Sequence, residues 1–348
     1  MTVETSTSFV VNSTVPFIEY IDRKIKFWLY FVFLIPSILF SLFLLHQFLF
    51  DRTLRRTLSN HIIILLLLTI VFCQMTMYPW MMYHYNHRGI WYRSLTFCVI
   101  WGFIDWAIYM LQILLFAWAA VERHILIFHD KLVSTRRKRF LFHYLPPVLI
   151  IIYCLFFYSF VYFYPSCSNI FDVYLTICVV VCLSTNPMFR AIETFFNNVL
   201  PNFVIIVFSI LLLFRIFWQK QRINQPMRWR KHRKMTIQLL SISVLYLSVT
   251  SPWALVVFLR MCGWMTDLSA ALDYYAFYVS YYVVLLYPFF AMLSLPDLKM
   301  RLKKLFFLSK CQRTVEPIER RTHMAPSNWF RMKLIRFLFV IVKRRSEE

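Results

Sequence analysis

The chain has 348 residues, of which 60% are hydrophobic and only 16% are charged. A soluble domain of this length would carry about a quarter charged residues, so the composition predicts an integral membrane protein. The three glycines exclude a glycine-rich phosphate loop or a dinucleotide-binding fingerprint. The net charge of +22 does not predict a nucleic-acid partner, because the basic residues gather in clusters between apolar segments.

Seven apolar segments are each long enough to cross a bilayer as a helix. In chain order they cover residues 27–50, 60–82, 97–121, 141–164, 197–219, 236–261 and 273–295. A further apolar run at 173–183 has only about eleven residues, too few to cross as a helix, so we expect it in an outer loop. The pattern predicts an all-α membrane protein with a seven-helix bundle. It divides the chain into an N-terminal segment (1–26), the bundle (27–295) and a tail (296–348).

The lysines and arginines predict how the bundle is oriented. Basic clusters follow the first, third, fifth and seventh spans, whereas the alternate loops carry few such residues. The positive-inside rule therefore predicts an extracellular N-terminus and a cytoplasmic tail. Asn12 begins the sequon Asn-Ser-Thr on the predicted outer side and is a candidate glycosylation site.

The third span carries polar or reactive residues at spacings that return to one helix face: Cys98, Asp105 and the run Glu122-Arg123-His124. On an ideal helix Asp105 lies roughly 27 Å from Arg123, close to the thickness of the hydrocarbon layer. One face would thus carry a thiol at one surface, an acid within the membrane and an ion pair at the other surface. An ionisable residue inside a span is by default a candidate functional residue.

The chain resembles the rhodopsin-like G-protein-coupled receptors over roughly residues 25–308. The resemblance is carried by the seven spans, the outer N-terminus and the run Glu122-Arg123-His124 at the inner end of the third span. In that family an acid, an arginine and usually a tyrosine end the third helix, and here His124 replaces the tyrosine. The resemblance implies a plasma-membrane receptor that couples an extracellular small-molecule or peptide ligand to a heterotrimeric G protein. The sequence shows no nucleophile–base arrangement and no metal cage, so we expect neither enzymatic activity nor a cofactor. Glu122 would restrain Arg123 at rest, and activation would free Arg123 to contact the G protein.

The resemblance also implies a disulfide, because the family places a cysteine 25 residues before that arginine, where Cys98 stands. Its usual partner lies in the second outer loop. Cys167 is the expected partner, and Cys178 and Cys182 are alternatives. The family's helix kinks correspond to three prolines: Pro201, Pro252 and Pro288.

After the seventh span, residues 299–308 alternate basic and apolar side chains. This resembles the family's short amphipathic helix, which lies on the lipids of the inner leaflet. Cys311, just beyond it, is a candidate palmitoylation site.

Asp105 stands eighteen residues before the arginine, where receptors for amines pair a carboxylate with the ammonium of the ligand. Tyr281 matches a tyrosine that holds this carboxylate in those receptors, and Trp106 and Tyr109 are further candidates for the pocket. In the alternative interpretation Asp105 bonds to Tyr281 or to the backbone and only braces the bundle. The fifth span offers no serine cluster for a catechol, but polar residues stand near its outer end: Glu193, Asn197 and Asn198.

Other positions depart from the family. Tyr287 replaces the asparagine before Pro288, and Ile70 stands where the second span usually carries an acid. No acid occurs between residues 219 and 250, so the restraint that an acid on the sixth helix gives Arg123 in many members cannot form. This predicts signalling without ligand. The alternative class is a transporter or channel, which would show internal repeats and charges within several spans.

Overall fold

The computed structural model describes residues 22–87, 94–171, 177–222, 226–262 and 269–293. The chain divides into two compact units at Pro296, and all described residues belong to the first. Three predicted features lie outside the described residues: Asn12, the amphipathic helix at 299–308 and Cys311.

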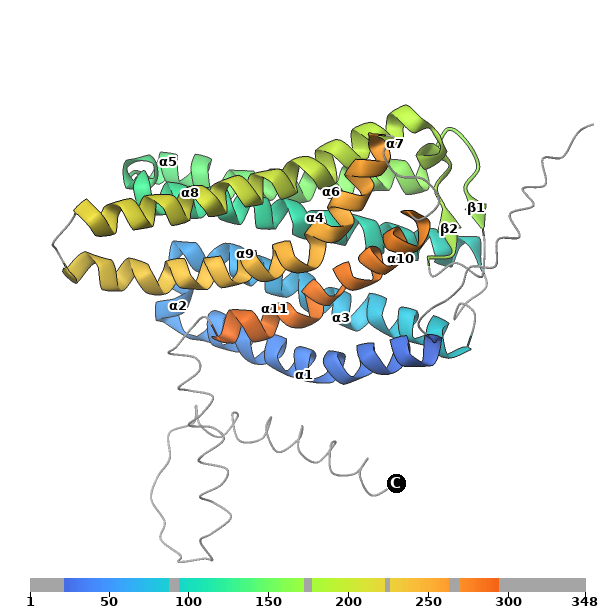
Figure 1. Cartoon of the computed structure of the whole chain (residues 1–348), viewed down its shortest axis with the longest axis horizontal. Helices are drawn as coiled ribbons and strands as arrows, with labels where there is room; N and C mark the ends of the chain where they lie inside the picture. Colours follow the sequence, from blue (N-terminus) through green and yellow to red (C-terminus); the bar gives the residue numbers. More distant parts are fainter. Residues whose placement is uncertain (1–21, 88–93, 172–176, 223–225, 263–268, 294–348) are drawn as a thin grey trace, which may run out of the picture. The chain divides into compact units, whose positions relative to one another are not determined.

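The described chain is almost entirely helical (Figure 1). Its α-helices are α1 (Arg23–Phe50), α2 (Arg52–Arg56), α3 (His61–His87), α4 (Leu95–Phe128), α5 (Arg136–Arg139), α6 (Leu145–Phe163), α7 (Pro187–Thr194), α8 (Leu200–Arg222), α9 (Pro226–Met261), α10 (Ser269–Ser280) and α11 (Tyr282–Leu293). Short 3₁₀ turns are η1 (Leu58–Asn60), η2 (Asp130–Val133) and η4 (Cys182–Thr185), and π-helical turns are η3 (Phe140–Tyr144) and η5 (Phe195–Val199). Strands β1 (Ile170–Phe171) and β2 (Val179–Val180) form an antiparallel hairpin with Ile170 opposite Val180.

Seven helical stretches in the described part are long and apolar enough to cross a membrane, which confirms the predicted number of such helices. The fourth span runs through α5, η3 and α6, and the fifth through α7, η5 and α8. The fifth begins at Pro187 rather than at residue 197. The side chain of Asn186 caps this start by accepting hydrogen bonds from the backbone N–H groups of Met188 (2.9 Å) and Phe189 (3.3 Å), and proline fits the first helical position.

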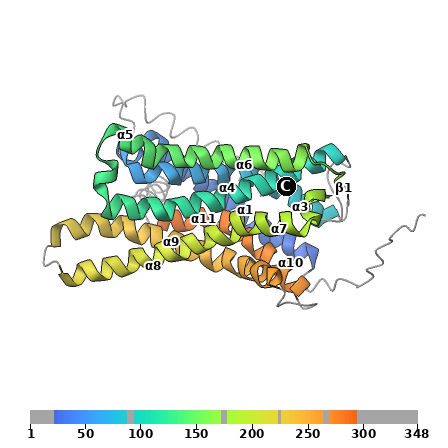
Figure 2. The ribbon, with the colours of Figure 1, turned by 90° about the horizontal axis from the view of Figure 1, so that it is seen from above.

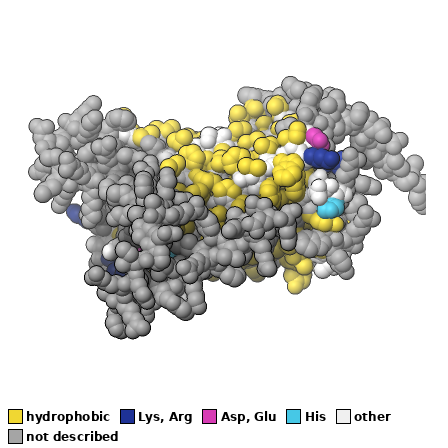
Figure 3. Space-filling model, turned by 90° about the horizontal axis from the view of Figure 1, so that it is seen from below, with side chains coloured by type: hydrophobic (Ala, Val, Ile, Leu, Met, Phe, Trp, Pro, Cys, Tyr) yellow, Lys and Arg dark blue, Asp and Glu magenta, His cyan; other side chains and the backbone are white. Residues whose placement is uncertain are grey.

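Helix α4 lies at the centre of the packing, where it contacts α3, α6, α8 and α9. Helix α1 packs on α3 and α11, while α9 packs on α8, α10 and α11. Two views show the hairpin at one end of these helices and α5 at the other (Figures 1 and 2). Many large apolar side chains point outward, including Trp28, Phe156 and Phe203. On one face they cover most of the described surface between the ends (Figure 3), as a helix surrounded by lipid requires.

The seventh span is interrupted at Tyr281, between α10 and α11. A break inside a membrane frees backbone carbonyl groups that other groups must bind. The carbonyl of Tyr281 accepts from the backbone N–H of Val284 (3.1 Å) and also from the hydroxyl of Tyr78 (2.7 Å). Pro288 has no N–H to offer the carbonyl of Val284, and the amide of Gln74 binds that carbonyl instead (3.4 Å). Side chains of α3 therefore stabilise the interruption.

The other two prolines predicted to mark kinks lie in different settings. Pro201 is the second residue of α8, directly after the π-helical turn η5, so the backbone is irregular next to it. Pro252 lies inside α9, which continues as a helix through it.

Candidate functional site

Two disulfides hold the hairpin at one end of the bundle. Cys98, near the start of α4, is bonded to Cys178, with the two Cα atoms 5.3 Å apart. Cys167 is bonded to Cys182 (Cα–Cα 6.0 Å). The predicted pairing of Cys98 with Cys167 is therefore wrong, and the alternative Cys178 is the partner. The reason is that Cys178 directly precedes β2, the strand that contacts α4.

A glycine permits this contact. A Cβ atom built on Gly102 of α4 would lie 2.6 Å from the Cε1 atom of Tyr162 and 2.8 Å from a methyl group of Val179 in β2. Real Cβ atoms essentially never approach other heavy atoms so closely. Position 102 must therefore lack a side chain for the hairpin to lie against α4.

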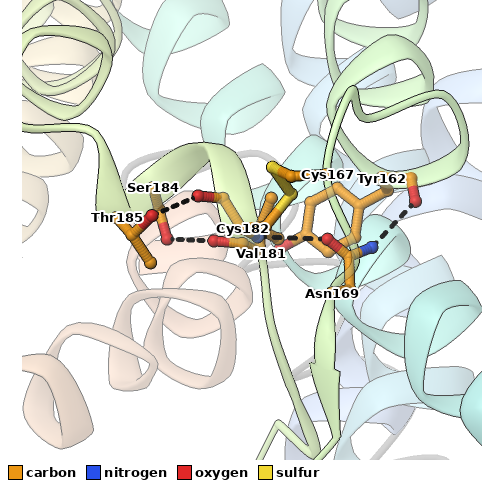
Figure 4. Close-up of a disulfide and its surroundings, with 7 residues drawn as sticks. All are labelled: Tyr162, Cys167, Asn169, Val181, Cys182, Ser184 and Thr185. Carbon is orange, nitrogen blue, oxygen red and sulfur yellow. Dashed lines mark hydrogen bonds between the residues drawn. A yellow bond between two sulfur atoms is a disulfide. The ribbon is translucent and has the colours of Figure 1, made fainter. Parts of the chain in front are cut away.

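The second disulfide lies in a network of hydrogen bonds (Figure 4). The side chain of Asn169 donates to the carbonyl of Tyr162 (3.3 Å) and accepts from the backbone N–H of Cys182 (3.1 Å). The hydroxyl of Thr185 donates to the carbonyl of Cys182 (2.6 Å). The base of the hairpin is thus tied both to the end of α6 and to the turn that leads into α7.

A cavity of about 800 Å³ lies next to the hairpin. Its wall is formed by strand β2 and by residues of α4, α6, α7, η5, α9 and α10. This volume is within the range of small-molecule sites. The wall is mostly apolar and aromatic, with Trp106, Trp253 and Phe277 among its rings. Its acidic residues among those described are Glu193 and Asp273.

Of the four residues predicted to bind ligand, only Trp106 lines this cavity. Asp105 is 2% exposed, and the hydroxyl of Tyr281 donates to its Oδ2 atom (2.7 Å). The rings of Trp106 and Phe277 stack with centroids 6.0 Å apart, and Phe277 contacts Tyr281 edge-on at 5.0 Å. Tyr109 packs on the ring of Tyr281. An aromatic layer thus lines the cavity wall and contacts the Asp105–Tyr281 pair, whose hydrogen bond is expected in both interpretations of Asp105. What separates Asp105 from the ligand role is that it does not line the cavity.

The other end of α4 carries Glu122, Arg123 and His124, all buried. Arg123 lines a small internal cavity of about 20 Å³ together with Tyr246 of α9 and Tyr287 of α11. The hydroxyl groups of these two tyrosines have no hydrogen-bond partner among the described residues. Residues of α3, α4, α8, α9 and α11 line this cavity together with Arg123.

The carboxylate of Glu122 contacts the ring Nδ1 atom of His143, which lies in η3 at the start of the fourth span. The Nε2 atom of His143 lies 2.9 Å from the Nδ1 atom of His61, and the Nε2 atom of His61 lies 3.0 Å from the carbonyl oxygen of Arg55. We call the connected side chains of Glu122, His143 and His61 the relay. The relay joins the second, third and fourth spans to the loop between the first two spans. Sequence analysis missed it, because nothing local distinguishes His143.

The relay requires a definite number of protons. Each of its three contacts needs one hydrogen: between Glu122 and His143, between the two rings, and between His61 and the carbonyl oxygen. Two neutral imidazoles supply only two such hydrogens. The third sits either on an imidazole or on Glu122, so the group of three side chains carries no net charge. This neutrality lowers the cost of burying Glu122 and His143, each of which is 1% exposed.

Sequence analysis noted Glu193 and Asn198 but did not place them in the site. They stand before and within the predicted start of the fifth span, and only the earlier helix start at Pro187 puts both on the cavity wall.

Within the described residues, no group of three or more His, Cys, Asp or Glu side chains could hold a metal ion. Comparisons with models of protein families and with curated protein sequences found no match to this chain.

Proposed function

We propose that the chain is a seven-helix receptor that transmits the binding of an extracellular ligand to a cytoplasmic heterotrimeric G protein. In this proposal the hairpin end faces outward and the Arg123 end faces the cytoplasm, as the basic clusters predict. The large cavity receives the ligand, and the region around Arg123 receives the G protein.

One observation carries the proposal: the third, fifth, sixth and seventh spans each line both cavities. The fifth span contributes Glu193 to the large cavity and Ile205 to the small one. Helix α4 contributes Trp106 to the large cavity and Arg123 to the small one, about 26 Å away along an ideal helix. Helix α9 contributes Trp253 and Tyr246. The seventh span contributes Phe277 to the large cavity and Tyr287 to the small one.

This arrangement supports signalling by a shift between two conformations. Suppose that the ligand binds more tightly to a second conformation, in which the aromatic wall of the cavity has moved. Ligand binding would then favour the positions that α4, α9 and the seventh span take in that second conformation. The same helices would then separate around Arg123 and expose it to the G protein. The interruption at Tyr281 gives the seventh span a joint between its two contributions, because α10 and α11 are separate helices there.

The relay supports a role for Glu122 in the resting arrangement. Glu122 and Arg123 are neighbours on α4, and the contact with His143 ties this end of α4 to the fourth span. We expect the resting state to hold the relay intact.

The test is a G-protein activation assay in cells that express the full chain at measured surface levels. Arg123→Ala should abolish both ligand-free signalling and any signal evoked by a panel of amines and short peptides. The matched control is Arg55→Ala, which removes an exposed arginine near the same end while leaving the backbone carbonyl in the relay. Signals that persist in Arg123→Ala, or no signal from the native chain in any condition, would contradict the proposal.

A further inference from the structure

We propose that the large cavity binds an aromatic amine, whose ammonium pairs with Glu193 and whose neighbouring hydrogen-bond acceptor is held by Asn198. This inference rests on the proposed receptor function and names the chemical class of its ligand. It moves the acid that meets the ligand from Asp105 on the third span to Glu193 on the fifth.

The two acids of the cavity wall differ in their partners. Asp273 is fully engaged, because one carboxylate oxygen accepts from the indole N–H of Trp253 (3.1 Å) and the other from Arg260 (2.9 Å). Glu193 accepts one hydrogen bond, from the hydroxyl of Tyr158 (3.0 Å), and forms no ion pair with the described basic residues. The basic residues of the wall are Arg190 and Arg260; Arg260 pairs with Asp273, and Arg190 forms no ion pair with Glu193. A carboxylate at a mostly apolar wall that no ion pair neutralises is costly, and a ligand ammonium would offset that cost.

Asn198 supplies a donor next to this carboxylate. Its side chain is 1% exposed and lines the cavity. Its Oδ1 atom accepts from the amide of Asn202 (3.3 Å), whereas its own Nδ2 atom has no partner among the described residues. A buried N–H₂ group without a partner carries a desolvation cost. The protein covers this group, so an oxygen acceptor on the ligand would bind it after the side chain turns toward the cavity.

The π-helical turn η5 brings these two groups to the same wall. Residues five apart on an α-helix point about 140° away from each other. In η5 the backbone N–H of Leu200 donates to the carbonyl of Phe195, five residues earlier, so the turn is wider. Glu193 and Asn198 are also five residues apart across this turn, and both line the cavity.

The aromatic wall specifies the rest of the ligand. Trp106 and Phe277 stack on each other, and Trp253 lies 5.2 Å from Phe277 between ring centroids. Such faces bind flat aromatic groups, and they also attract a cation. The volume of about 800 Å³ has room for a ligand with two rings.

The experiment measures binding to the purified full chain in lipid nanodiscs, by the rise of the unfolding temperature with ligand concentration. The probes share one body and differ at one group: 3,3-diphenylpropylamine, 3,3-diphenylpropanol and 3,3-diphenylpropionic acid. A fourth probe, 3-amino-1,1-diphenylpropan-1-ol, adds a hydroxyl acceptor to the amine. We expect the amine to bind at least about tenfold more tightly than the alcohol or the acid, and the amino alcohol more tightly still.

The chain offers a matched pair of variants. Glu193 and Asp105 each accept a hydrogen bond from one tyrosine hydroxyl, but only Glu193 lines the cavity. Glu193→Gln should weaken amine binding by about tenfold or more, whereas Asp105→Asn should change it less than about twofold. Asn198→Ala should abolish the advantage of the amino alcohol over the amine.

Several results would overturn the inference. They are equal binding of amine and alcohol by the native chain, no amine binding at about 1 mM, or amine binding lost in Asp105→Asn but kept in Glu193→Gln. The comparison of probes on the native chain decides the question even if a variant fails to fold. Amine binding that depends on Glu193 without any G-protein activation would refute the proposed function while leaving the ligand site standing.

Discussion

Replacing His143 by phenylalanine tests the relay at the Arg123 end. The substitution keeps an aromatic ring but removes both nitrogen atoms, so it breaks the contacts with Glu122 and His61. Glu122 is 1% exposed, and its Oε2 atom has no hydrogen-bond partner among the described residues. With the relay in its ionic form, with one imidazolium and the Glu122 carboxylate, losing the partner of the buried carboxylate costs about 3–5 kcal/mol. We expect His143→Phe to lower the free energy of unfolding by this amount.

The assay is thermal unfolding of the purified full chain, with His61→Phe as the matched control. That control removes the far end of the relay but leaves the contact between Glu122 and His143. It should cost only about 1 kcal/mol for each hydrogen bond lost. The two histidine variants should therefore unfold at clearly different temperatures.

A double-mutant cycle with Glu122→Gln identifies the cause. A neutral amide costs less to bury than a carboxylate, so Glu122→Gln should restore part of the stability that His143→Phe removes. Strictly additive effects, or equal destabilisation by the two histidine variants, would refute the argument that His143 compensates a buried acid.

Three further predictions concern the hairpin and the bundle centre. Gly102→Val should destabilise the chain by about 1–3 kcal/mol through overpacking against the hairpin, seen as a lower unfolding temperature and reduced surface expression. Mass spectrometry of unreduced peptides should find Cys98 linked to Cys178, and a link to any other cysteine would contradict the structure. Tyr281→Phe removes the hydrogen bond to Asp105 and should cost about 1–3 kcal/mol, while binding of 3,3-diphenylpropylamine stays unchanged. A large loss of amine binding in Tyr281→Phe would contradict this prediction and would indicate that Asp105 belongs to the ligand site.

The seven apolar spans could be predicted from the sequence, because the length and polarity of a segment decide whether it can cross a membrane. These are local properties that need no knowledge of neighbours. The same holds for the third span: the spacing of Cys98, Asp105 and Arg123 places them along one helix, and the structure has all three on α4. The start of the fifth span was missed, because the cap at Asn186 precedes the apolar run that marked the helix.

Tertiary structure alone decided which groups meet. The partner of Cys98 depends on the strand that lies against Gly102, and the partner of Glu122 is His143 on another span. Asp105 looked like the exceptional acid because it stands inside an apolar span, yet Glu193 is the acid on the cavity wall. The physical reason is that a sequence shows the polarity of a side chain, whereas its partners are set by helix rotation, and a single π-helical turn changes that rotation.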